Sequence, residues 1–166
     1  MLAKERPGTG HYLGPLVSVV IAADHDTARH GDLEDLRSCL QALASQKVDE
    51  PVEFLLVESD ERVRTLPTDL IAGLPGLRVL GVPHDGSYER KNAAVRAAQG
   101  EIVAILDADC IPVSDWLQSL INTLRSHPQY VAVSRRTMYE GKTAIERSLW
   151  VLSRGYLDPA KEAPNY

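Results

Sequence analysis

The chain has 166 residues, of which 44% are hydrophobic and 25% charged, as is ordinary for a compact globular protein. Its formal net charge of −5 argues against a sequence-blind nucleic-acid binder, whose surface would be basic. No apolar run approaches the ~18 residues of a membrane span, and two cysteines are too few for a disulfide framework. We therefore expect no nucleic-acid partner, no membrane segment in this chain and a cytoplasmic location.

The first half of the chain predicts alternating strands and helices. Residues 1–15 are rich in Gly and Pro and predict a flexible lead-in, followed by a domain over 16–157 and a tail over 158–166. Strands are expected at 17–21, 52–57 and 77–82, where β-branched and other apolar residues form short runs. A helix that Asp32 would cap carries leucines at steps of three and four, and a shorter helix is expected within 66–74.

The second half continues this alternation. Ser87 would cap a helix that runs to Ala98 and stops at Gly100. The apolar run 102–106 predicts a fully buried strand in the centre of the sheet, and Ser114 would cap the next helix. A fifth strand is expected at 130–134 and a last helix around Ile145, Leu149 and Leu152. Strands that alternate with helices predict an α/β fold with a mostly parallel sheet flanked by helices.

Two acids follow the strand at 102–106 and are the main candidates for a functional site. Only Ala108 separates Asp107 from Asp109, and Pro112 prevents a simple continuation of the strand. In open parallel sheets, ligands bind beyond the carboxyl ends of the strands. Two carboxylates so close together repel each other unless a cation or hydrogen-bond donors offset their charge, and Mg²⁺ or Mn²⁺ would do so through oxygen ligands. The alternative is a turn in which the acids cap the following helix.

Four segments together resemble a family 2 glycosyltransferase. They are Val17–Ile21 with the helical stretch Cys39–Gln46, then Phe54–Glu58, then Lys91-Asn92 through Glu101, and finally Leu106–Asp109 with Pro112 and Trp116. Each segment alone is weak, but all four occur in the family's order and spacing. The resemblance implies a Rossmann-like GT-A fold that is truncated after its nucleotide-binding half.

The resemblance also implies roles for named residues. Asp109 would bind the Mn²⁺ or Mg²⁺ ion that bridges the two phosphates of the donor, and Asp107 would reach the ribose and help to hold the metal. Glu58 would contact the base or ribose, unless it is only a solvated strand-end acid. Arg90 and Lys91 would attract the diphosphate of a UDP- or GDP-sugar, unless they are solvated surface cations.

The loop after the first strand departs from the family. Ala22-Ala23-Asp24-His25 stands where the family usually has Pro, an aromatic residue or Arg, and then Asn. Ala22 and Asp24 are therefore assigned to donor binding only by their position.

The family implies an inverting transfer of the sugar to an acceptor hydroxyl. This step needs a general base, and Glu140 and Glu146 are the acids that follow in the chain, although neither lies in the family's pattern. We assign no catalytic base.

Alternative functions stay open at this point. One is a non-catalytic domain, or an inactive fragment without the acceptor half, that holds a nucleotide sugar without transferring it. Other phosphate-handling α/β enzymes fit less well, because they place their acid pair or Gly-rich loop after the first strand. Membrane association through parts of a longer parent chain is a further alternative to a purely cytoplasmic location.

Overall fold

The computed structural model describes residues 17–23, 33–83, 86–135, 137, 143–145 and 148. The predicted lead-in over 1–15, the Asp32 cap, Asp24 and the tail over 158–166 lie outside these residues. The chain divides into two compact units, Met1–Ser119 and Leu120–Tyr166. In the described part of the chain, no helix combines the length and the apolar character that a membrane crossing requires.

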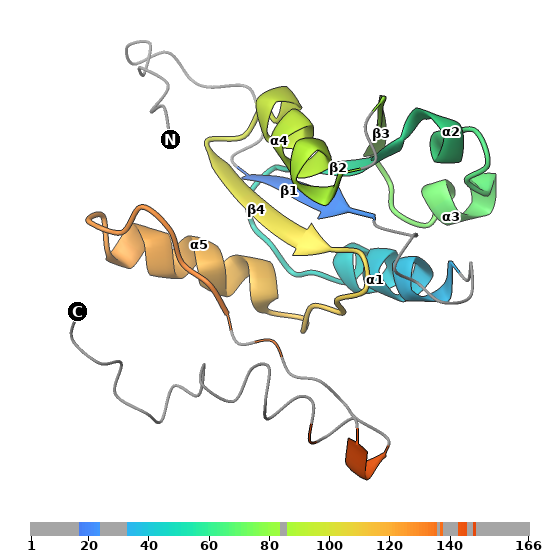
Figure 1. Ribbon diagram of the computed structural model, residues 1–166. Coiled ribbons are helices and arrows are strands. Elements are labelled where there is room, and N and C mark those ends of the chain that lie inside the picture. Colours follow the sequence, from blue (N-terminus) through green and yellow to red (C-terminus); the bar gives the residue numbers. More distant parts are fainter. Residues whose placement is uncertain are drawn as a thin grey trace. The chain divides into compact units, whose positions relative to one another are not determined.

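The first unit is built on a parallel sheet of four strands in the order β3-β2-β1-β4 (Figure 1). The strands are β1 (Val17–Ala22), β2 (Val52–Ser59), β3 (Leu77–Val82) and β4 (Ile102–Asp107). The helices are α1 (Glu34–Ala44), α2 (Asp60–Val63), α3 (Thr68–Ala72) and α4 (Ser87–Ala97). The helix α5 (Trp116–Ser126) begins in this unit. The predicted fold class, a parallel α/β sheet flanked by helices, is confirmed.

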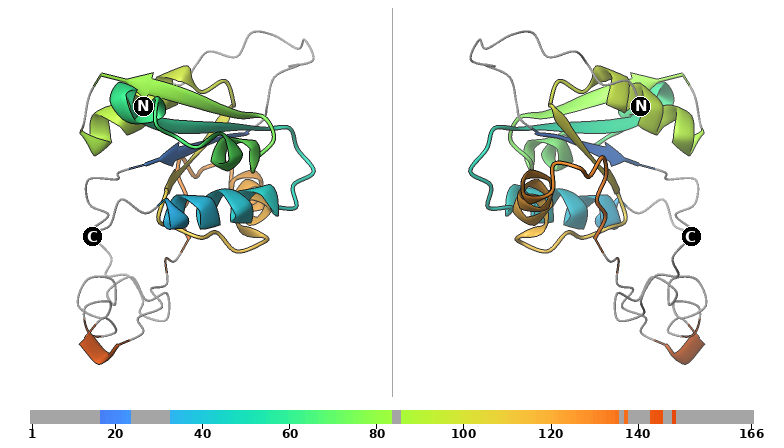
Figure 2. Two further views of the ribbon diagram at one scale, coloured as in Figure 1. Left: turned by 90° about the vertical axis from the view of Figure 1, so that its right-hand side faces the viewer. Right: turned by 90° about the vertical axis from the view of Figure 1, so that its left-hand side faces the viewer.

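Helices cover both faces of the sheet, with α4 on one face and α1 on the other (Figures 1 and 2). The leucines of α1 and Cys39 recur on one side of that helix and are all buried. On the other face, the small residues Ala94 and Ala98 let the α4 segment pack closely against a core with Val20 and Leu55. The interior strands β1 and β2 are consequently buried on both faces, which explains their nearly continuous apolar sequence.

The prediction of a central, fully buried strand at 102–106 is wrong. Among the described residues, β4 pairs only with β1 and therefore lies at the edge of the sheet. Ala104 is its one buried residue, and Ile105 is 50% exposed. An apolar run indicates that a strand tends to be buried, but it does not specify the position of that strand within the sheet.

Several local predictions also need correction. Neither Ser87 nor Ser114 caps a helix, since α4 begins at Ser87 with Gly86 as its cap residue and α5 begins at Trp116. The short helix α2 was not predicted. Residues 130–134 form no strand, because no described strand pairs with them and most of their side chains are exposed. Leu149 and Leu152, which were expected in a last helix, lie outside the described residues.

Gly100 has a different role from the predicted helix stop. The helix α4 ends at Ala97, and Ala98 is already extended. At Gly100 the chain passes so close to β1 that a Cβ atom there would lie 2.5 Å from the backbone nitrogen of Ser18. Only glycine allows this approach, which places the start of β4 beside the start of β1.

A polar network around the buried Glu53 carboxylate joins four segments at the amino edge of the sheet. The Ser18 hydroxyl donates a hydrogen bond of 2.5 Å to Oε2 of Glu53, which also accepts one from the backbone N–H of Gln99. Arg78 forms an ion pair with the other oxygen of Glu53, and the N–H of Gly100 donates to the Ser18 hydroxyl. Burial raises the pKa of Glu53, but the bonds from Ser18, Gln99 and Arg78 outweigh it, so the pKa lies below its ordinary value.

Glu53→Gln should destabilise the fold at neutral pH by about 1–3 kcal/mol, because charge-assisted hydrogen bonds to a buried carboxylate are lost. Since the folded-state pKa of Glu53 is lowered, its contribution is complete above the ordinary value of 4.5 and is lost as the pH falls through the folded-state pKa. Urea unfolding of both proteins between pH 7 and pH 3 should show the difference shrinking below pH 4.5. A difference that stays constant over this range would contradict the assignment.

Candidate functional site

The carboxyl edge of the sheet contains a point where the strand order changes direction. From β1 the chain adds β2 and then β3 on one side, and β4 pairs with the other side of β1. Ala22, at the end of β1, is in register with Val57 of β2 and with Asp107 of β4. The backbone N–H of Ala108 donates a hydrogen bond of 3.0 Å to the Ala22 carbonyl, so the pairing extends just past the last residue of β4. In open α/β sheets, such a switch point is where ligands bind.

Asp107 lies at this switch point and is engaged by a cation from α4. The Lys91 ammonium is 2.6 Å from Oδ1 of Asp107, and the two side chains are 24% and 56% exposed. Because both groups reach water, the pair contributes little to stability. The pair shows that a cationic group can lie against the Asp107 carboxylate at the edge of the sheet.

Asp109 is exposed and lies in the turn that follows β4. Its Oδ1 atom is 3.6 Å from the Cys110 sulfur. Two carboxylates at the end of one strand fit a hard divalent cation, which prefers oxygen ligands and commonly keeps several waters. No third His, Cys, Asp or Glu completes a cluster with them among the described residues. The remaining ligands of an ion here would be water and the oxygens of a bound phosphate.

Glu58, near the end of β2, forms a buried ion pair with Arg90 of α4. The guanidinium Nη1 lies 2.6 Å from Oε1 of Glu58, and the side chains are 1% and 0% exposed. The same oxygen accepts a hydrogen bond of 2.7 Å from the backbone N–H of Ser59. The alternatives of a solvated strand-end acid and of a solvated cation at Arg90 are therefore wrong. In this conformation, neither side chain presents surface to a nucleotide.

A glutamine amide holds the loop that follows the acids. The side chain of Gln46, just beyond α1, donates a hydrogen bond of 2.8 Å to the Val113 carbonyl and accepts one of 3.1 Å from the N–H of Leu117. One amide thereby joins the later part of the connection between β4 and α5 to the first turn of α5. These contacts restrain the chain from Val113 to Leu117 without using either acid.

Cys39 lies in α1 close to the same loop. Burial, followed by repulsion from Cys110 and Asp109, raises the pKa of the Cys39 thiol to about 12. A thiol with this pKa stays protonated at neutral pH and behaves as a small apolar side chain. The interpretation of Cys39 as a core residue is supported.

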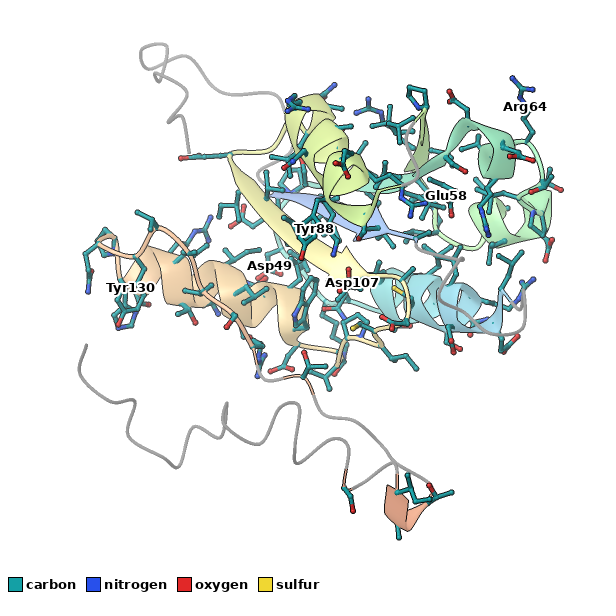
Figure 3. The ribbon with its side chains drawn as sticks, viewed as in Figure 1. Asp49, Glu58, Arg64, Tyr88, Asp107 and Tyr130 are labelled. Atoms are coloured by element: carbon teal, nitrogen blue, oxygen red, sulfur yellow. The ribbon has the colours of Figure 1, made fainter. Side chains whose placement is uncertain are left out.

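The predicted site residues fall into two groups. Ala22, Lys91 and Asp107 meet at the switch point, with Asp109 two residues further on. Glu58 and Arg90 pair with each other in the interior, and Asp24 lies outside the described residues. Neither ion pair could be predicted from the sequence, because the two partners of each pair come from different elements. Glu58 and Asp107 both lie toward the carboxyl ends of the strands (Figure 3).

Residues 27–163 match the family model of glycosyl transferase family 2. Among curated proteins, the chain is similar to glycosyltransferase AglE of Haloferax volcanii, with 28% identity over 114 residues. This alignment covers 66% of the present chain and 36% of AglE, so the chain spans little more than a third of that relative.

A solved structure, that of TarS from S. aureus, aligns with 75% of the chain and covers 23% of TarS. The sequence identity is 18% and the TM-score is 0.47.

Arg90→Met should destabilise the protein by about 3–5 kcal/mol, because it leaves the Glu58 carboxylate buried without its guanidinium. A matched control is Arg37→Met, which removes the ion pair of Arg37 with Asp69, whose side chains are 36% and 68% exposed. The control should lose at most about 1 kcal/mol. Thermal and urea unfolding would measure both changes, and equal losses would contradict a special role for the buried pair.

The two cysteines should differ sharply in reactivity. Iodoacetamide at pH 8 should alkylate the half-buried Cys110 and leave Cys39 unmodified, because the pKa of Cys39 is raised to about 12. Mass spectrometry of the digested native protein would identify the modified residue. Modification of Cys39 at a rate similar to that of Cys110 would show that α1 does not protect it.

Proposed function

Because the chain belongs to glycosyl transferase family 2, we propose that its parallel sheet forms the donor site of an enzyme that transfers a sugar from a nucleotide diphosphate sugar to an acceptor hydroxyl. The observation that carries the proposal is the acid pair at the switch point of the sheet, beside a lysine from α4. Acids alone would repel a diphosphate, so this arrangement suits an anionic donor only together with cations. The donor is proposed to be a UDP- or GDP-sugar and the transfer to be inverting.

Asp109 and Asp107 are the residues that would hold Mn²⁺ or Mg²⁺. The ion, when bound, supplies positive charge that offsets the charge building on the leaving diphosphate. Lys91 lies beside this place and would attract the same diphosphate, helped by the positive end of the α4 dipole. No residue is proposed as the general base, and the predicted cytoplasmic location stays a prediction.

Glu58 and Arg90 receive a changed role in this proposal. Their side chains have almost no exposed surface, so direct contact with the base or the diphosphate does not fit this conformation. We propose instead that the pair fixes the start of α4 against the end of β2. The nucleoside would then bind against a surface whose shape this ion pair maintains.

Asp109→Asn should remove metal-dependent nucleotide binding, with a loss of at least about tenfold in affinity, because a hard cation loses one of its two carboxylates. The fold should stay intact, since Asp109 is exposed, and weaker repulsion of Asp107 would leave the melting temperature without metal unchanged or higher. Calorimetric titration with UDP, GDP and their sugars, with and without Mn²⁺, measures this effect.

Asp49→Asn is the control, because Asp49 is an exposed acid in the loop before β2 and so lies at the amino edge of the sheet. It should bind nucleotide like the unmodified chain. Nucleotide binding by Asp109→Asn with unchanged metal dependence would show that the acid pair is structural. Binding of donor without transfer to any of a panel of acceptors would favour the alternative of a domain that only holds a nucleotide sugar.

A further inference from the structure

Two consecutive residues of α4 reach carboxylates at the ends of two different strands. Arg90 pairs with Glu58 of β2, and Lys91 pairs with Asp107 of β4, with β1 lying between those strands. One helix turn therefore bridges the carboxyl edge of the sheet. The two pairs have similar N–O distances, 2.6 Å in each case, but opposite environments.

The environments determine how easily each pair separates. Breaking the Arg90–Glu58 pair would leave two charges with almost no access to water, so this contact is a permanent anchor for α4. The Lys91–Asp107 pair reaches water at the edge of the sheet, since the Lys91 side chain is partly exposed and that of Asp107 is exposed, so water can solvate both groups when they part. Lys91 can therefore leave Asp107 while α4 stays in place.

We propose that Lys91 is an exchangeable counterion for Asp107, which it neutralises until a divalent cation binds there. This inference rests on the proposed function, because it concerns the same metal and donor. An ammonium at Oδ1 and a divalent cation on the same carboxylate compete for one position and repel each other. Once displaced, the lysine side chain has a new anionic partner available in the diphosphate.

Competition at Asp107 makes metal and nucleotide binding cooperative. Without nucleotide, the cation must displace Lys91 and then tolerate its positive charge nearby. With nucleotide bound, the diphosphate takes up Lys91, so the metal binds more tightly. By thermodynamic linkage, the metal must then strengthen nucleotide binding by the same factor. The Lys91–Asp107 ion pair would thus weaken metal binding to Asp107 and Asp109 when no nucleotide is bound.

The test is to measure Mn²⁺ binding to the whole chain without nucleotide, using the electron paramagnetic resonance signal of free Mn²⁺. Lys91→Met should bind Mn²⁺ about three- to tenfold more tightly than the unmodified chain, because competition and repulsion both disappear. Lys91→Arg keeps the positive charge and should stay within about twofold of the unmodified chain. Lys47→Met removes an exposed lysine just beyond α1 and controls for the change in net charge.

Repeating the titration with saturating UDP or GDP tests the cooperativity. The nucleotide should tighten Mn²⁺ binding to the unmodified chain, and this factor should be smaller in Lys91→Met. Equal Mn²⁺ affinity of Lys91→Met and the unmodified chain without nucleotide would overturn the inference. Metal-dependent nucleotide binding by the unmodified chain would uphold the proposed metal and donor site even then. Failure of every variant to bind Mn²⁺ would overturn the inference together with the proposed metal site.

Discussion

The parallel pairing of β1 with both β2 and β4 is the constraint on which the rest of the site depends. It places β1 in the interior of the sheet, where all its residues are buried, and brings the ends of three strands to one edge. Because the order of the strands changes direction at β1, the segment after β4 can leave the sheet without colliding with the segments that follow β2. Ala22 is in register with Asp107, and the extra hydrogen bond from Ala108 to Ala22 carries this alignment into the turn that presents Asp109.

The helix α4 connects this edge to the interior through two neighbouring basic residues. Arg90 makes a contact that the protein cannot give up without burying an uncompensated charge, whereas Lys91 makes one that water readily replaces. A helix anchored by Arg90, with one exchangeable side chain, suits the proposed site, which would accept both a cation and an anion. Arg90 thereby holds the position of α4, whereas the neighbouring Lys91 can exchange its partner.

The two edges of the sheet treat their acids in opposite ways. At the amino edge, Glu53 is buried and bonded by Ser18, Gln99 and Arg78, so its charge stabilises the fold. At the carboxyl edge, Asp107 and Asp109 are exposed, repel each other and add nothing comparable to stability. An acid that is hydrogen-bonded within the protein stabilises the fold. Acids that are exposed to water at a switch point are available to bind a ligand.

The sequence by itself determined the strands and main helices of the first unit, the parallel α/β class and the family, because apolar periodicity and motif order are local properties of the chain. It also located the acid pair at the carboxyl edge of the sheet, since strand ends in a parallel sheet meet there. Only the tertiary structure decided that β4 lies at the edge of the sheet, that Arg90 turns inward to Glu58 and that Lys91 holds Asp107. Adjacent residues of a helix point in different directions, and what each one meets depends on strands that are far away in the chain. Pairing and burial are long-range properties, and an apolar run such as residues 130–134, which form no strand, does not specify them.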